Sequence, residues 1–203
     1  MGAEGGGRGI VAVALAFAAG CLPSARLVTR LARGQAIEEL GDGKPGASNV
    51  YRSLGPVPGI TVMALDALKA FTPAAALRAG GASQSVVAAA AAAPVAAHVT
   101  VVGGQGAAAA LGAAFALDTP ATLAALVPIV GGTWLGYHPQ GVLAGALAFP
   151  VARGLLRRRM AAALQAATLP TILIAARLRG RRSAGPPRSA RVALNRLLLD
   201  RDE

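Results

Sequence analysis

The chain has 203 residues, of which 54% are hydrophobic and only 14% are charged, and its formal net charge is +11. Soluble domains carry about 25% charged residues, so this composition excludes an ordinary soluble domain and indicates an integral membrane protein. Aromatic residues make up 3% of the chain, too few for base stacking, so the positive charge is not assigned to nucleic acid. The single cysteine, Cys21, excludes an internal disulfide, and the sequence has no cysteine–histidine cluster for a metal.

The chain begins with a glycine-rich stretch, residues 1–9, which is expected to be loose. Residues 10–28 form an apolar segment long enough to cross a membrane core of about 30 Å. A lipoprotein signal peptide ending at Cys21 is a rival interpretation of this stretch. The end of the segment is basic, as the positive-inside rule expects at the cytoplasmic face; the residues concerned are Arg26, Arg30 and Arg33.

Further apolar segments follow a polar connection, at residues 56–78, 83–102, 107–117, 119–136, 140–156 and 160–176. The segment 107–117 is short for a full crossing and is expected to be re-entrant or to thin the bilayer locally. Residues 189–199 predict an amphipathic helix at the interface, with Leu194, Leu197 and Leu198 on its apolar face. The sequence therefore predicts an all-α, polytopic membrane helix bundle of about seven hydrophobic segments. We expect one domain, residues 1–203, in which 177–203 is a basic cytoplasmic tail.

With the N-terminus outside, the connection 26–52, the turns 103–106 and 137–139 and the tail all face the cytoplasm. The same count places Arg153 and the run 157–159 outside, against the positive-inside rule. Either one hydrophobic segment does not span the membrane, or this loop is an exception to the rule.

The polar connection contains a glycine-rich turn that leads into an arginine. Gly41, Gly43 and Gly46 permit positive φ and close backbone approach, and successive N–H groups in such a turn can form a concave anion site. A helix that opens here places Asn49 and Arg52 on one face, with the guanidinium able to bind phosphate oxygens. The pattern predicts a phosphate cradle, although the same residues also make ordinary loops.

Two further features carry polar groups within apolar segments. Asp66 and Lys69 lie one helical turn apart, where each charge costs about 2.5–3.5 kcal/mol. They either neutralise each other as a buried pair, or Lys69 points toward a phosphate held by the glycine turns. His98 ends an apolar helix, where a local hydrogen bond is its commonest role. A second glycine turn follows, which is another anion site, a plain tight turn or a helix-packing face; its glycines are Gly103, Gly104 and Gly106.

In this order the motifs resemble those of the bacterial acyl-phosphate:glycerol-3-phosphate acyltransferases, the PlsY-type family of membrane enzymes. That family's first motif reads Gly-Ser-Gly-Asn-x-Gly-Ala-Thr-Asn-x-x-Arg-x-x-Gly. Residues 41–55 match it, with Asp42 in place of the serine and Lys44 in place of the first asparagine. The Asp-x-x-Lys-Gly of the family's next helix is matched by Asp66 and Lys69, followed here by an alanine.

The later motifs match less closely. The family's Gly-His followed by Gly-Gly-Lys-Gly is matched by Ala97-His98 and residues 103–106, with Gln105 in place of the lysine. Residues 132–137 resemble the family's fifth helix and its turn. The His and Asn of the last family motif have no counterpart around residues 177–182, although Asn195-Arg196 resembles a displaced remnant.

The resemblance implies an enzyme that transfers a fatty acyl group from acyl phosphate to the 1-hydroxyl of glycerol 3-phosphate, giving lysophosphatidic acid. It implies a bacterial inner-membrane location among membrane lipids, an active site facing the cytoplasm, and neither a cofactor nor a metal; no oligomeric state follows. The residues assigned to catalysis are Arg52, Lys69, His98 and Asn49. The residues assigned to substrate phosphate are Gly41, Gly43, Lys44, Gly46, Ser48, Gly103, Gly104 and Gly106.

Two other functions remain open on the sequence. One is a catalytically inactive relative that binds lipid phosphate or a partner enzyme, because Asp42, Lys44 and Gln105 depart from the family's motifs. The other is a small helical transporter that uses Asp66 and Lys69 as charges along a pathway.

Overall fold

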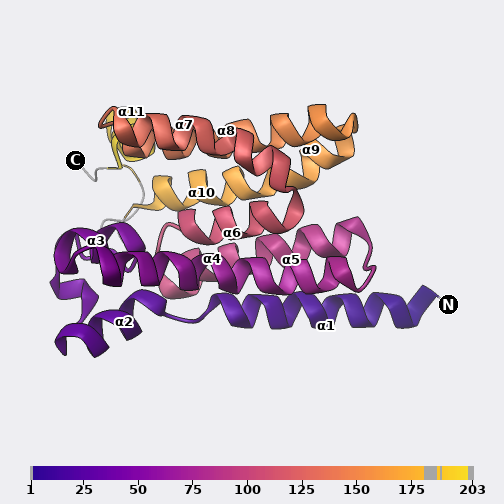
Figure 1. Ribbon diagram of the computed structural model, residues 1–203, viewed down its shortest axis with the longest axis horizontal. Helices are drawn as coiled ribbons and strands as arrows, with labels where there is room; N and C mark the ends of the chain where they lie inside the picture. The colour runs from indigo at the N-terminus through magenta and orange to yellow at the C-terminus, as the bar shows by residue number, and fades with distance from the viewer. Residues whose placement is uncertain (1, 181–186, 188, 201–203) are drawn as a thin grey trace. The chain divides into compact units, whose positions relative to one another are not determined.

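The computed structural model describes residues 2–180, 187 and 189–200, and the regular elements in these ranges are all helical (Figure 1). Contacts between residues divide the chain into two compact units, Met1–Ala116 and Leu117–Glu203, which are described in turn.

The first unit contains α1 (Gly2–Gly20), α2 (Ser24–Arg33), the short 3-10 helix η1 (Ile37–Glu39), α3 (Ala47–Leu54), α4 (Pro56–Ala79), α5 (Gln84–Ala97), the π-helical segment η2 (His98–Val102) and α6 (Ala107–Leu117), whose last residue opens the second unit. The second unit contains α7 (Thr119–Trp134), α8 (His138–Arg157), α9 (Met160–Ala166), α10 (Thr168–Arg179) and α11 (Ala190–Leu199).

Each of the seven predicted hydrophobic segments is helical, which confirms the all-α class. Within the described residues, four helical stretches are long and apolar enough to cross a membrane: Gly7–Arg33, Pro56–Ala79, Gln84–Val102 and Met160–Arg179. The expected short segment is α6, with 11 residues.

The first segment differs from the prediction at both of its ends. Residues 2–9, expected to be loose, form the first turns of α1, where Gly9 lies against the side chain of Val86 on α5. The helix then ends at Gly20, well before residue 28. Pro23 lacks the N–H that would continue the helical ladder, and it is the N-cap residue of the separate helix α2.

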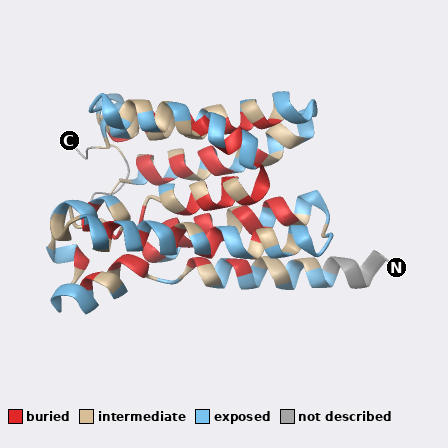
Figure 2. Ribbon diagram, viewed as in Figure 1, coloured by how far each residue is buried: buried red, intermediate tan, exposed pale blue. Residues whose placement is uncertain are grey.

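Small residues let the helices of the first unit approach closely. A Cβ added to Gly20 of α1 would lie 2.8 Å from the Cβ of Ala97, and one added to Gly112 of α6 would lie 2.6 Å from the backbone carbonyl carbon of Ala67. Apolar lipid gives helices little reason to associate, so close van der Waals packing of this kind is a main source of stability. Figure 2 shows the buried residues on the faces that helices turn toward one another.

A small apolar cluster lies beneath the first glycine turn. Its buried members are Ala25 of α2, Ile37 of η1, Val50 of α3 and Val62 of α4. Because each residue comes from a different element, the cluster fixes both ends of the turn 40–46 against the start of α4.

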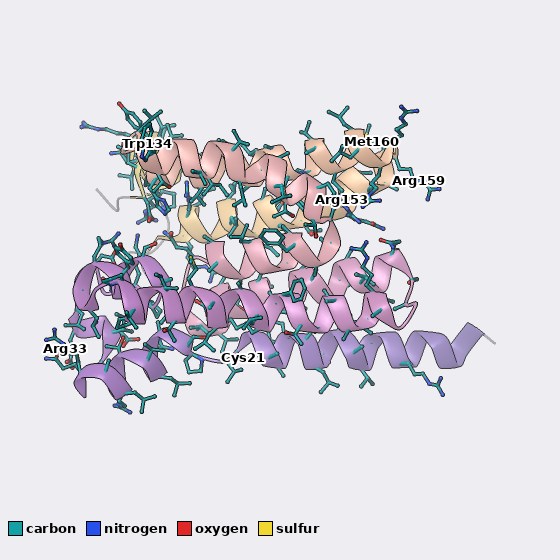
Figure 3. All side chains as sticks on the ribbon, in the orientation of Figure 1. Cys21, Arg33, Trp134, Arg153, Arg159 and Met160 are labelled. Atoms are coloured by element: carbon teal, nitrogen blue, oxygen red, sulfur yellow. The ribbon has the colours of Figure 1, made fainter. Side chains whose placement is uncertain are left out.

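In the second unit, α7 and α8 pack along their length as an antiparallel hairpin. A Cβ added to Gly132 would lie 2.7 Å from the Cα of Gly141, so glycine permits the contact nearest the turn. Trp134 and Tyr137 project from that turn and are exposed, as expected for aromatic rings at a membrane interface. Figure 3 shows Trp134 at one end of the hairpin and Arg153, Arg159 and Met160 at the other.

The predicted C-terminal helix is present as α11, but an arginine and not the leucines faces inward. Arg196 is 2% exposed and donates hydrogen bonds to the carbonyl oxygens of Leu178 (3.0 Å) and Arg179 (3.2 Å), which end α10. Arg177 of α10 donates in return to the carbonyl of Leu197, at 2.7 Å. Buried guanidinium groups can satisfy the unpaired carbonyls of helix ends, which apolar leucines cannot.

The leucines of α11 divide differently from the expectation. Leu194 and Leu198 are exposed and Leu197 is half-buried. Most of the Gly-Pro-Pro break at 185–187 and much of the basic tail lie outside the described residues.

Candidate functional site

The first glycine turn leads directly into helix α3, as the sequence predicted, with Gly46 as the N-cap residue. Gly41 and Gly43 adopt left-handed backbone conformations, with φ of 53° and 70°. A side chain at Gly41 would overlap the amide oxygen of Asn49. Gly46 is extended, with φ of −148°, so the positive φ expected there is not observed.

Asn49 is the centre of this turn. Its side chain is buried, and its Nδ2 donates to the carbonyls of Leu40 (2.9 Å) and Lys44 (3.1 Å). Its Oδ1 accepts from the backbone N–H of Asp42 (3.2 Å) and from the hydroxyl of Ser53 (3.3 Å). These bonds use the full capacity of an amide side chain, so Asn49 holds the turn in shape and has no group left to bind substrate.

Several backbone N–H groups expected to bind an anion bond within the turn instead. The N–H of Gly43 donates to Leu40 O (2.9 Å), that of Lys44 to Asp42 Oδ1 (3.0 Å), and that of Gly46 to Lys44 O (2.9 Å). In the first turn of α3, the N–H groups of Asn49 and Val50 donate to the Gly46 carbonyl at 3.1 and 3.2 Å. The N–H groups of Ala47 and Ser48 come before the first acceptor that the helix itself offers, so they are the donors available to an anion.

Arg52 lies in the last turn of α3, and its side chain is 59% exposed. Helical side chains lean toward the N-terminus of their helix, so the guanidinium reaches back over the glycine turn. There its Nη2 donates to Oδ2 of Asp42 at 2.5 Å. The position of Arg52 beside the glycine turn is therefore consistent with the prediction. The partner observed there is the carboxylate of Asp42, which belongs to the turn itself.

Asp66, Lys69 and His98 form a buried cluster between α4 and the start of η2. The Lys69 ammonium donates to the carbonyl of Leu22 (2.9 Å) and to Nδ1 of His98 (2.8 Å), and its Nζ lies 2.8 Å from Oδ1 of Asp66. The predicted buried pair is therefore present. The alternative, in which Lys69 points toward a phosphate, does not match these contacts, because protein acceptors surround its ammonium.

The tautomer of His98 follows from its hydrogen bond with Lys69. An ammonium group can only donate, so Nδ1 is the acceptor and Nε2 carries the hydrogen. A Cβ on Gly104 would overlap this Nε2, so the N–H is directed at the second glycine turn. His98 opens the π-helical segment η2, a widened turn of a kind that is frequent at functional sites.

The second glycine turn closes over the end of this π-helical segment. The N–H groups of Gly103 and Gly104 donate to the His98 carbonyl at 3.1 and 3.3 Å. A Cβ on Gly104 would lie 2.9 Å from the carbonyl oxygen of Pro45, so the backbones of the two glycine turns touch at this point. A continuous series of contacts therefore runs from Arg52 through the first turn to Gly104, His98 and Lys69.

Some residues of this site were not predicted from the sequence. The carbonyl of Leu22 becomes available because α1 breaks there, and the Pro45 carbonyl is placed by the fold of the turn. The contact between Ser53 and Asn49 could have been predicted, since the two residues lie four apart on one helical face. Among the described residues, no group of three His, Cys, Asp or Glu side chains could hold a metal ion.

The fold and these contacts define a helical membrane protein in which two glycine turns meet beside an exposed arginine and a buried Lys–His–Asp cluster. A protein-family model described as glycerol-3-phosphate acyltransferase matches residues 10–182. The chain belongs to the glycerol-3-phosphate acyltransferase family.

Individual relatives agree with this assignment. The glycerol-3-phosphate acyltransferase of Geobacter sulfurreducens is 31% identical over 156 residues, which cover 74% of this chain and 80% of that protein. The one from Klebsiella pneumoniae subsp. pneumoniae is 33% identical over 149 residues, covering 68% of this chain and 70% of the relative.

A solved structure is also similar: the crystal structure of PlsY (YgiH), an integral membrane glycerol 3-phosphate acyltransferase, in its glycerol 3-phosphate form. It has a TM-score of 0.75 and 25% identity, and the match covers 97% of this chain and 94% of that one. The lysophosphatidic acid form of the same protein has the same fold, with a TM-score of 0.74.

Proposed function

We propose that this protein transfers a fatty acyl group from an acyl phosphate to the 1-hydroxyl of glycerol 3-phosphate and forms lysophosphatidic acid. Membership of the family and the names of the relatives support the acceptor and the type of reaction. The main support for placing the reaction at this site is Arg52, whose exposed guanidinium is held over a rigid glycine turn at the start of a helix.

In the proposed reaction, the 1-hydroxyl oxygen attacks the acyl carbonyl carbon, and the bond from that carbon to the phosphate oxygen breaks. The leaving phosphate takes the hydroxyl proton, so no protein base is required. Arg52 pairs with substrate phosphate, and the first N–H groups of α3 donate hydrogen bonds to phosphate oxygens at the helix N-terminus. Such a site accelerates transfer by holding two anions in attack geometry and by stabilising charge on the oxygen.

The roles of the buried cluster and of the glycines follow from their contacts. Lys69 positions His98, whose Nε2–H adjoins the second glycine turn and serves there as a hydrogen-bond donor. Asn49 positions the first turn through its four hydrogen bonds. The glycines of both turns act mainly by allowing the close backbone approach that brings Pro45 against Gly104.

We place this site at the cytoplasmic face of the inner membrane. In the first unit, the end that carries the glycine turns also carries Arg26, Arg30, Arg33, Lys44 and Arg52. The opposite ends of α1 and α4 carry Arg8 and Arg78. Basic residues gather on the cytoplasmic side of membrane proteins, and a cytoplasmic site would receive a water-soluble phosphorylated acceptor directly.

The test is acyl transfer by the purified protein in lipid vesicles, given a long-chain acyl phosphate and labelled glycerol 3-phosphate. We expect labelled lysophosphatidic acid, and a loss of about a hundredfold or more in kcat/KM for Arg52→Ala. Arg30→Ala, which removes an exposed arginine of α2, should retain wild-type turnover. Absence of labelled product from the inserted, helical wild-type protein would overturn the proposal.

A further inference from the structure

The guanidinium assigned to substrate phosphate already has an anionic partner. Oδ2 of Asp42 accepts a hydrogen bond from Nη2 of Arg52 at 2.5 Å. A carboxylate and a phosphate present similar oxygens to the same face of a guanidinium. The two anions therefore compete for one cation.

The Asp42 carboxylate is held in this position from two sides. Its backbone N–H is fixed by Oδ1 of Asn49 (3.2 Å), and its own Oδ1 accepts the N–H of Lys44 (3.0 Å). Only Oδ2 is directed to Arg52. Asp42 is thus part of the rigid turn, whereas Arg52 is a long and mostly exposed side chain that can turn to another partner.

We propose that Asp42 is a built-in competitor for the phosphate of glycerol 3-phosphate, so that substrate binds by displacing the Asp42 carboxylate from Arg52. The inference rests on the proposed function for the identity of the ligand. After displacement, the fixed carboxylate stays close to the bound phosphate and repels it. Both effects weaken the ground-state complex and raise KM, and the acyl-transfer step itself is not involved.

The variant Asp42→Asn isolates the charge, because an asparagine of the same shape still accepts the Lys44 N–H through its side-chain oxygen. We expect it to bind glycerol 3-phosphate about three- to tenfold more tightly, the range of one partly exposed ion pair plus one nearby repulsive charge. Binding is measured calorimetrically without acyl phosphate, and inorganic phosphate should show a gain in the same direction. Asp42→Ser, also neutral, serves as a second variant.

The matched control is Glu38→Gln. Glu38 also makes a partly exposed ion pair with an arginine, Arg26, at 2.6 Å, and its own backbone carbonyl lies beside Gly43 of the same turn. This change removes one negative charge near the turn but none from Arg52, so the affinity should change by less than about twofold. In an Arg52→Ala background, Asp42→Asn should give no gain, because the contested cation is absent.

The readouts separate this inference from the proposed function. Tighter binding by Asp42→Asn, together with no product from the wild-type protein, would support the competitor and overturn the acyltransferase assignment. Equal or weaker binding by both neutral variants would overturn the competitor, whatever the turnover. A gain of the same size in the Glu38→Gln protein or in the Arg52→Ala background would also overturn it, since the effect would then come from net charge alone.

Discussion

Lys69 shows how a charged side chain is tolerated inside an apolar segment of this protein. Its ammonium lies 2.8 Å from Oδ1 of Asp66, while the Leu22 carbonyl and His98 accept its hydrogen bonds. Removing one partner of such a pair leaves an uncompensated buried charge, whereas removing both charges together can be close to neutral. The cluster should therefore behave as a unit when it is mutated.

We expect Lys69→Met to destabilise the protein by about 3–5 kcal/mol, because the Asp66 carboxylate would be left buried and unpaired. Adding Asp66→Asn should recover a substantial part of this loss, although each single change is harmful. The measurement is reversible denaturation in detergent or vesicles, followed by circular dichroism. Arg33→Met, at the exposed end of α2, is the control and should shift stability by less than about 0.5 kcal/mol. Additive losses in the double variant would contradict a coupled pair.

For individual residues, the sequence indicated which side chains lie close together better than it indicated what those side chains do. The i, i+3 spacing of Asp66 and Lys69 made a buried pair one of two alternatives, and the structure shows that pair. The same kind of spacing placed Asn49 beside Arg52 but could not show that four loop groups bond to the Asn49 side chain. That information depends on the path of the turn, which local spacing does not specify.

Among the helices, the best predicted are those with clear end signals. Residues 56–78 were expected and α4 is Pro56–Ala79, because a glycine precedes its first proline and Gly80 follows its end. The break between α1 and α2 was missed because the apolar pattern runs on through Cys21 and Leu22. The π-helical turn at His98 was also missed, since it has no established sequence signal.

The arginine-rich end of α8 explains part of the conflict with the positive-inside rule. Arg153 is buried and donates to the carbonyl of Ala162 (3.0 Å), and Nε of Arg157 lies 2.5 Å from Oδ2 of Asp118. Two of the arginines at this turn are thus occupied by internal partners. Asp118 also caps α7 by accepting the N–H of Ala121 at 3.3 Å, a role that its position before Thr119-Pro120 could have indicated.

The Asp118 contact makes stability depend on pH. Burial acts to raise the pKa of Asp118, but the Arg157 hydrogen bond and the Ala121 N–H outweigh it and hold the pKa below its ordinary value. The stabilisation is therefore complete above that ordinary value, about 4, and it is lost as pH falls through the lower pKa of the folded state.

We expect the melting temperature of the wild type to exceed that of Asp118→Asn at pH 6, and the gap to narrow steadily below about pH 4. At pH 6 the difference should correspond to about 1 kcal/mol, because asparagine keeps the helix cap and only the partly exposed ion pair with Arg157 is lost. Thermal unfolding in detergent between pH 2.5 and 6 measures it, with Glu38→Gln as a variant whose exposed pair should give a smaller gap. A gap that stays constant across this range would show that Asp118 does not titrate as proposed.

At the scale of the whole molecule, the sequence leaves open how many of the seven hydrophobic segments cross the membrane. In the second unit, the turn with Trp134 and the turn with Arg159 lie at opposite ends of the α7–α8 hairpin (Figure 3). Neither helix is among the four stretches that length and hydropathy alone mark as spanning. Glycines bring the two helices into close contact, and the backbone polar groups of each are satisfied within the helix, as a membrane core requires.

Because the chain has one cysteine, its orientation can be measured residue by residue. In a Cys21→Ser background, we expect a membrane-impermeant maleimide to label Gln84→Cys and Arg159→Cys in intact spheroplasts. Arg33→Cys and Tyr137→Cys should react only in inverted membrane vesicles. The chain is expected to cross the membrane seven times from an outside N-terminus, which places residues 84 and 159 outside and residues 33 and 137 inside. Basic residues that no internal acceptor binds favour the cytoplasm.

All four replaced side chains are exposed, so accessibility to the reagent is limited by the membrane and not by packing. Labelling after detergent solubilisation controls for reactivity, and acyl transfer by each variant controls for folding. Labelling of Arg159→Cys from the same side as Arg33→Cys would mean that an odd number of the intervening segments fails to cross, with the 11-residue α6 the first candidate. Labelling of Arg33→Cys from outside would instead invert the first unit and place the glycine turns away from the cytoplasm.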